Sequence, residues 1–120
     1  MSPTPLVTST QVYAVRDGHP LTLEITIGDG QAGGTSIIWL GDILDLPPNP
    51  QPFELAKDGG TTRTKILHCT TRVRDVNPAT NRTSVTYTLR GGVSDQDFPF
   101  DVTVPSENAW ATYVVDFVFI

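Results

Sequence analysis

The sequence predicts an all-β protein that folds as a single antiparallel β-sandwich of about seven strands over residues 1–120. Three observations support this fold class: short runs alternate between apolar and polar residues, glycine and proline mark turns between them, and no helical or heptad periodicity occurs. An immunoglobulin-like arrangement fits the size and strand count. A jelly roll or a small barrel is the alternative, because alternation does not reveal strand order.

The first half of the chain supplies three of these strands. Thr8–Val15 is predicted as an edge strand, and the turn Arg16–Pro20 follows it. Leu21–Ile27 alternates strictly, so one of its faces packs and the other meets water. A flexible glycine-rich connection, Gly28–Gly34, leads into Ser36–Leu40, which is apolar on both faces and is therefore predicted to be central.

The middle and late segments are less uniform. The stretch Pro47–Pro52 holds four prolines, lacks backbone donors and is predicted as a crossover loop. Glu54–Lys57 fits either a short strand or one helical turn. After a polar loop at Gly91–Asp97, alternation resumes in Phe98–Val104 and predicts another strand.

Two alternating runs between Arg63 and Arg90 predict a hairpin around the turn Asp75–Asn81. In that turn Pro78 fixes φ, and the side chain of Asn77 is suited to close an Asx-type hydrogen bond. The mostly apolar face of the hairpin would consist of Leu67, Cys69, Thr71, Val73, Thr83, Val85, Tyr87 and Leu89.

Charge is distributed unevenly along the chain. The net charge of −5 argues against nucleic acid as a partner, since phosphate is held mainly by Lys and Arg. Residues 63–90 hold six basic residues and one acidic residue, giving +5, so the remainder carries −10. A symmetric hairpin would place Arg74 opposite Arg82, and an acidic partner would relieve their repulsion. The acidic remainder of a second copy could be that partner. Alternatively, the two arginines splay apart in solvent and need no partner.

The last strand points to an interface. Trp110–Ile120 is apolar on both faces, so it is either central in its own sheet or covered by a partner. We expect three apolar residues to form the centre of a protein interface and three arginines to orient an acidic partner. The predicted interface residues are Val114, Val118, Ile120, Arg72, Arg74 and Arg82.

A carbohydrate-binding module, with or without calcium, is the alternative function. Trp110 stands at a loop-to-strand junction, where its indole would be offered to a sugar ring with Asn108 and Glu107 as polar neighbours. The same tryptophan would also serve as a packed cap. The oxygen-rich loops Asp75–Asn81 and Ser94–Asp97 do not match EF-hand spacing, so neither a metal site nor a cofactor is predicted.

An enzyme is the third alternative. His19 and His68 have no adjacent nucleophile and acid at a recognisable spacing, and no phosphate-binding glycine motif occurs. Catalysis would gain support if either histidine met a carboxylate at the base of a pocket. Cys69, on the apolar face of the hairpin, is interpreted as a buried small hydrophobe and not as a reactive thiol. The protein is therefore predicted to be non-catalytic.

The expected setting is cytoplasmic. The amino terminus shows no export signal, and Trp110–Ile120 is too short to span a membrane. The glycosylation triplet Asn81–Thr83 consequently carries little weight. Together these observations predict a protein-interaction module that binds a protein, first of all itself as a homo-oligomer, and neither nucleic acid nor membrane.

Overall fold

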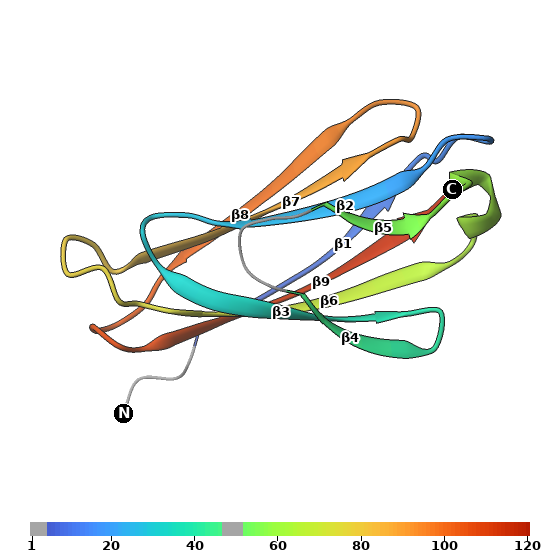
Figure 1. Cartoon of the computed structure of the whole chain (residues 1–120). Coiled ribbons are helices and arrows are strands. Elements are labelled where there is room, and N and C mark those ends of the chain that lie inside the picture. Colours follow the sequence, from blue (N-terminus) through green and yellow to red (C-terminus); the bar gives the residue numbers. More distant parts are fainter. Residues whose placement is uncertain (1–4, 47–51) are drawn as a thin grey trace.

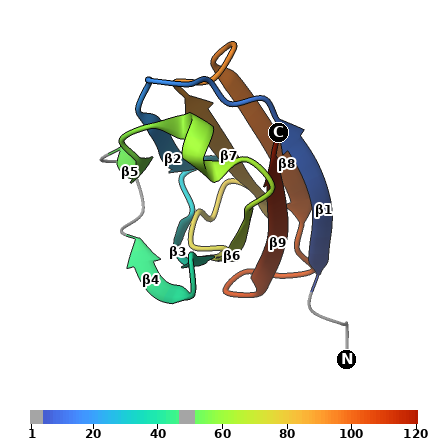
Figure 2. The same cartoon turned by 90° about the vertical axis from the view of Figure 1, so that its right-hand side faces the viewer.

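The computed structural model describes residues 5–46 and 52–120, which form two β-sheets (Figure 1). Sheet A has the spatial order β1 (Leu6–Tyr13), β9 (Trp110–Phe119), β6 (Ile66–Arg74), β3 (Ala32–Trp39) and β4 (Asp42–Leu46). Sheet B has the order β5 (Phe53–Ala56), β2 (Leu21–Ile27), β7 (Arg82–Arg90) and β8 (Gln96–Thr103). The two sheets face each other as the layers of a sandwich (Figure 2).

The predicted β-sandwich is confirmed, but the described residues form nine strands instead of about seven. Each sheet has two edge strands, so the small-barrel alternative is wrong. The immunoglobulin-like order is not established: in that arrangement the last two strands share a sheet, whereas β8 and β9 lie in different sheets. The jelly-roll alternative stays a prediction.

The core lies between the sheets, because alternation directs every second side chain inward. At its centre, Phe117 packs edge-to-face against Tyr87 and Phe98, with ring centroids 5.7 and 5.0 Å apart. Towards the carboxyl end of β9, Trp39 packs against Phe119 in the same way at 5.5 Å. Trp39, from the segment predicted to be apolar on both faces, therefore belongs to the core.

The segment predicted as a hairpin is an arch that crosses between the sheets. β6 pairs with β3 and β9 in sheet A, whereas β7 pairs with β2 and β8 in sheet B. The two predicted apolar faces are correct and buried, but they meet across the core. Arg74 therefore lies opposite Trp110, and Arg82 lies opposite Thr103. The expected Arg74–Arg82 pair was wrong because alternation identifies a buried face and not the neighbouring strand.

β9 is central in its own sheet, between β1 and β6, which was one of the two predicted alternatives. β1 is an edge strand as predicted, but it runs parallel to β9, with Leu6 opposite Thr112 and Tyr13 opposite Phe119. All other strand pairs are antiparallel. The prediction of a wholly antiparallel sandwich is wrong at this pair, because no short turn fixes the direction of strands so distant in sequence.

β3 starts earlier than predicted and includes part of the expected glycine-rich connection. Gly33 pairs with Val73 of β6, and a Cβ at Gly33 would lie 2.2 Å from the carbonyl oxygen of Arg72. A glycine is needed at position 33 because the two backbones approach closely, which explains why Gly33 and Gly34 lie within a strand. From the sequence alone, these two glycines were interpreted only as a source of flexibility.

The structure differs from the sequence prediction at two further places after β3. β4 was not predicted; it returns antiparallel to β3 with Trp39 opposite Asp42. β5 shows that the ambiguous segment Glu54–Lys57 contains a short strand and not a helical turn. The crossover loop predicted at Pro47–Pro52 lies outside the described residues except for Pro52.

The only helix among the described residues is the 3-10 turn η1 (Gly59–Thr62), which is capped by the Asp58 carboxylate. Gly60 N donates to that carboxylate at 2.9 Å, as expected for an Asp at a helix start. Within residues 5–46 and 52–120, no helix is long and apolar enough to cross a membrane.

Candidate interaction surface

The outer face of sheet A carries the second set of side chains from its strands. Sheet B covers only the inner face, so these outer side chains remain exposed or half-buried. On β9 they include two of the predicted interface residues, Val114 and Val118, which are both half-buried. Ile120, the third, follows β9 and is 57% exposed.

Apolar side chains gather at one end of this outer face. Val118 lies between Val12 of β1 and Ile66 of β6, and in the next row Ile38 of β3 lies opposite Ile43 of β4. Four of the five are well exposed, from 46% at Ile38 to 73% at Ile43. We call these five residues the apolar patch; contiguous exposed apolar side chains commonly mark interaction sites.

A histidine–aspartate pair lies beside the apolar patch. His68 of β6 stands opposite Asp116 of β9, and its Nδ1 contacts the Asp116 carboxylate. His68 also lies opposite Ile38 of β3, so His68 and Asp116 are in the same row of side chains as Ile38 and in the row next to Val118. Both side chains are more than one-third exposed on an open sheet. A carboxylate therefore contacts His68, but the pair lies on the open face of the sheet, whereas the condition set for catalysis was a carboxylate at the base of a pocket.

The other end of the outer face is basic and aromatic. The Arg72 guanidinium lies 5.5 Å from the centroid of the Trp110 ring, a cation–π contact. Arg74 donates to the side-chain oxygen of Asn108 at 3.2 Å. Trp110 is 41% exposed, and Glu107 is exposed in the preceding turn. Of the residues predicted together as a sugar site, Trp110 and Asn108 therefore contact the two arginines predicted for an interface, and Glu107 lies in the turn before them.

A shallow hollow adjoins this basic end. It lies over Gly34 of β3, where a Cβ would meet nothing within 4 Å, and Ser36, Asp45 and Arg72 are among the residues around it. The hollow exists because Gly34 has no side chain on the outer face. One acidic and one basic side chain, Asp45 and Arg72, line the hollow, and Arg72 also contacts the indole of Trp110.

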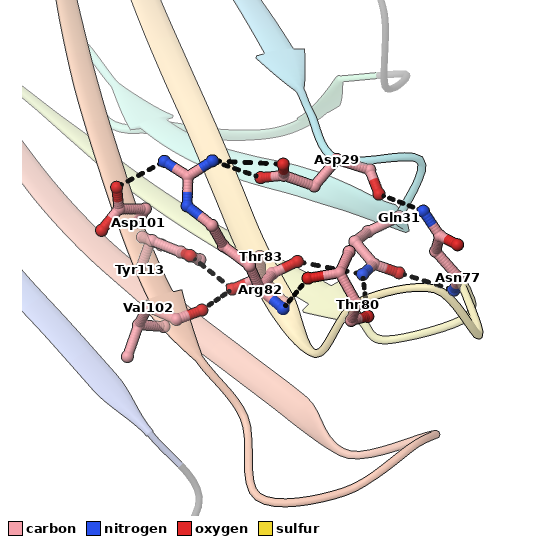
Figure 3. A network of polar contacts seen from close by, with 9 residues as sticks. All are labelled: Asp29, Gln31, Asn77, Thr80, Arg82, Thr83, Asp101, Val102 and Tyr113. Carbon is pink, nitrogen blue, oxygen red and sulfur yellow. Dashed lines mark hydrogen bonds and ion pairs between the residues drawn. The ribbon is translucent and has the colours of Figure 1, made fainter.

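Arg82, predicted with Arg72 and Arg74, is separated from them. It lies on the outer face of sheet B, where its guanidinium bonds Asp29 at 3.1 Å and Asp101 at 2.6 Å (Figure 3). The hydrogen bond to Asp101, followed by the charge of Asp29, raises the pKa of Arg82. Arg82 is therefore neutralised within its own chain, and the three arginines do not form one patch.

The arch that separates them is held by a buried glutamine. The Gln31 side-chain oxygen accepts from Val76 N and Asn77 N at 2.7 and 2.9 Å. Its amide nitrogen donates to the carbonyls of Thr80 and Arg82 (Figure 3). Asn77 also accepts from the backbone N–H of Ala79 at 3.0 Å, so the predicted Asx turn is confirmed. These bonds fix the crossing between the sheets.

Among residues 5–46 and 52–120, the two oxygen-rich loops included, no three His, Cys, Asp or Glu side chains gather around one point. His19 is solvent-exposed in its turn. Cys69 is fully buried, and burial raises the pKa of its thiol, which agrees with the interpretation of Cys69 as a small hydrophobe.

Asp75, the first residue of the arch, is 1% exposed, and neither of its carboxylate oxygens has a hydrogen-bond partner among the described residues. Burying a polar group without a hydrogen-bond partner costs free energy. We expect Asp75→Leu, which has a similar shape and removes both unpartnered oxygens, to raise the free energy of unfolding by about 1–3 kcal/mol in urea titrations. Equal or lower stability of the variant would contradict this account of Asp75.

Sequence reasoning missed most of the apolar patch. Val12, Ile43 and Ile66 come from three different strands, and only the strand order β1-β9-β6-β3-β4 brings them together. Of the missed residues, only Ile38 could have been found from the sequence, because the segment that contains it was recognised as apolar on both faces.

Comparison with known proteins found no matching family, no matching curated protein and no matching solved structure. A functional conclusion about this chain therefore depends on the chemistry of its own surface.

Proposed function

We propose that this protein is a non-catalytic interaction module that binds another protein, and first of all a second copy of itself, through the outer face of sheet A. The observation that carries the proposal is the apolar patch, which spans all five strands and is exposed in the single chain. Burying a valine or isoleucine side chain fully contributes about 1.5–3 kcal/mol, so the patch supplies a favourable centre for an interface.

The surroundings of the apolar patch suit a protein interface. Interfaces combine an apolar centre with a polar rim, and arginine and tryptophan are enriched in them. Arg72, Arg74 and Trp110 lie at the far end of the same face, and Asp45 and Asp116 provide acidic groups on it. A second copy offers both an apolar patch and charges of each sign. The proposal does not depend on an immunoglobulin-like or jelly-roll strand order.

The test is a charge placed in the apolar patch. We expect Ile43→Asp and Val118→Asp to raise the dissociation constant of self-association at least about tenfold, because a carboxylate would lose hydration in the contact. Ile43 is 73% exposed, so its substitution leaves the core intact. Thr26→Asp, at an exposed position on the outer face of sheet B, is the matched control and should have no effect. Sedimentation over a concentration series measures all three.

Glycan binding at Trp110 is the second candidate, favoured by the exposure of its indole and by its contact with Arg72, which lines the hollow over Gly34. The guanidinium of Arg72 lies over the ring, so a sugar would have to use the free face or displace the arginine. A shift of Trp110 fluorescence on a glycan panel, with and without calcium, tests it. Glycan binding measured by calorimetry that Trp110→Ala abolishes would favour this function over protein binding.

A further inference from the structure

β1 differs from the other edge strands because it lacks any feature that discourages pairing. Edge strands expose unpaired N–H and C=O groups, and proteins usually protect them with charges, proline or short length. β4 carries Asp42 and Asp45, β5 is four residues long and contains Glu54, and β8 contains Pro99. β1 has the sequence LVTSTQVY, eight residues with neither charge nor proline. Figure 2 shows it at the margin of the sandwich.

Among residues 5–46 and 52–120, the backbone groups of β1 that face no neighbouring strand belong to its even-numbered residues. The carbonyl of Pro5 accepts from Thr112 N and that of Tyr13 from Ile120 N, both at 3.0 Å, so odd-numbered residues point towards β9. Successive residues of a strand direct their backbone groups to opposite sides, so the even-numbered residues point away from the sheet. These residues are Leu6, Thr8, Thr10 and Val12.

These four residues would match the same four residues of a second β1 strand. In an antiparallel pair related by a two-fold axis through Ser9, Leu6 lies opposite Val12 of the second copy and Thr8 lies opposite Thr10. This register pairs all four residues, apolar with apolar and hydroxyl with hydroxyl, which are favourable cross-strand pairs. Each pair exchanges two backbone hydrogen bonds, about eight in total. A shift by two residues in either direction leaves Leu6 or Val12 unpaired.

We propose that β1 pairs antiparallel with β1 of a second copy, which joins the two copies of sheet A into one continuous ten-stranded sheet. The partner is a second copy because the strand has no charge with which to select a charged segment, while its register is self-complementary as a two-fold contact requires. With strands about 4.8 Å apart, the outer face widens from about 20 Å to about 43 Å. It then presents two apolar patches, one towards each end of the joined strands, because the two-fold axis reverses the direction of the second copy.

This pairing goes beyond the proposed function, because it uses the backbone edge of β1 and involves only one residue of the apolar patch, Val12. The two contacts can therefore fail separately. An Ile43→Asp variant that no longer associates through the outer face should still form the β1-paired dimer.

The first experiment is a disulfide scan of β1 in the full chain under mild oxidation. Ser9 would lie opposite itself in a pair that is not hydrogen-bonded, where Cα atoms are about 4.5 Å apart, within the range that a disulfide spans. We expect Ser9→Cys to form a covalent dimer on non-reducing gels, and Thr8→Cys and Thr10→Cys to do so at least about tenfold more slowly. Cys69 is fully buried and should not take part. Faster cross-linking of either control would overturn the proposed register.

The second experiment removes one donor at the free edge. Thr10→Pro deletes an N–H that points away from β9, a position where strands tolerate proline. In the Ile43→Asp background, where association through the outer face is removed, we expect Thr10→Pro to raise the dimer dissociation constant about tenfold or more, whereas Thr10→Ala, which keeps the N–H, should have no effect. Circular dichroism checks that both variants stay folded. A folded Thr10→Pro variant that dimerises like Thr10→Ala would overturn the pairing.

Discussion

Above pH 10 the protein is expected to lose about 1.4 kcal/mol of folding stability per pH unit for each tyrosine that stays neutral in the native state. All three tyrosines of the chain, Tyr13, Tyr87 and Tyr113, are buried. Burial is the main cause that raises the pKa of each one, and it also raises the pKa of Cys69. Ionisation of these groups is therefore opposed in the folded state.

The direction of the effect follows from these raised pKa values. A group whose pKa is higher in the folded state contributes its full stability below the pKa of the unfolded chain, about 9 for cysteine and 10 for tyrosine. That stability is lost as the pH rises further, because the unfolded chain releases the proton first. Urea titrations from pH 8 upwards, with tyrosinate absorbance recorded in parallel, should show ionisation and unfolding in the same transition.

Tyr87→Phe is the control for this prediction. The Tyr87 hydroxyl shares a hydrogen bond of 2.5 Å with Thr71, which in turn contacts Thr35 at 2.8 Å. The variant should be less stable at pH 7 by about 1 kcal/mol, yet its stability should fall less steeply above pH 10. Tyrosine ionisation in the folded protein at ordinary pKa values would contradict the buried arrangement.

Replacing the ring at the centre of the core is expected to have the second large effect. Phe117→Ala should lower the free energy of unfolding by about 3–5 kcal/mol, a large share of the stability of a small domain. Phe117 is fully buried, and its ring contacts those of Tyr87 and Phe98. The loss combines burial of the ring with the cavity left behind, because strands on both sides restrict collapse.

Phe98→Ala is the matched control for that substitution. Phe98 lies on β8, an edge strand, and is only half-buried, so removing its ring should cost clearly less than removing that of Phe117. Thermal or urea unfolding followed by circular dichroism compares the two. Equal losses would contradict the position of β9 at the centre of sheet A.

The faces of the strands could be predicted from the sequence, because alternation has a period of two regardless of which strand lies alongside. Leu67 and Val85 are buried as expected, and Arg72 is outside. The pairing of strands could not be predicted. The arch Asp75–Asn81 looked like a hairpin turn because its residues favour a turn in either setting. The groups that hold it as a crossing, among them the buried side chain of Gln31, are far away in sequence.

The candidate surface was predicted only in part for the same reason. The last strand was recognised as apolar on both faces, and Val114 and Val118 do lie on the outer face. The other members of the apolar patch depend on strand order, which alternation does not contain. Arg82 was assigned to the same surface because the hairpin was assumed; the arch places it on sheet B with Asp29 and Asp101.

The solution mass of the wild-type chain across a wide concentration range tests the central claim most directly. The account predicts a mass above the 13.0 kDa of one chain that increases with concentration, and a smaller mass for Ile43→Asp but not for Thr26→Asp. A wild-type mass of 13.0 kDa at every concentration would contradict self-association through the outer face of sheet A.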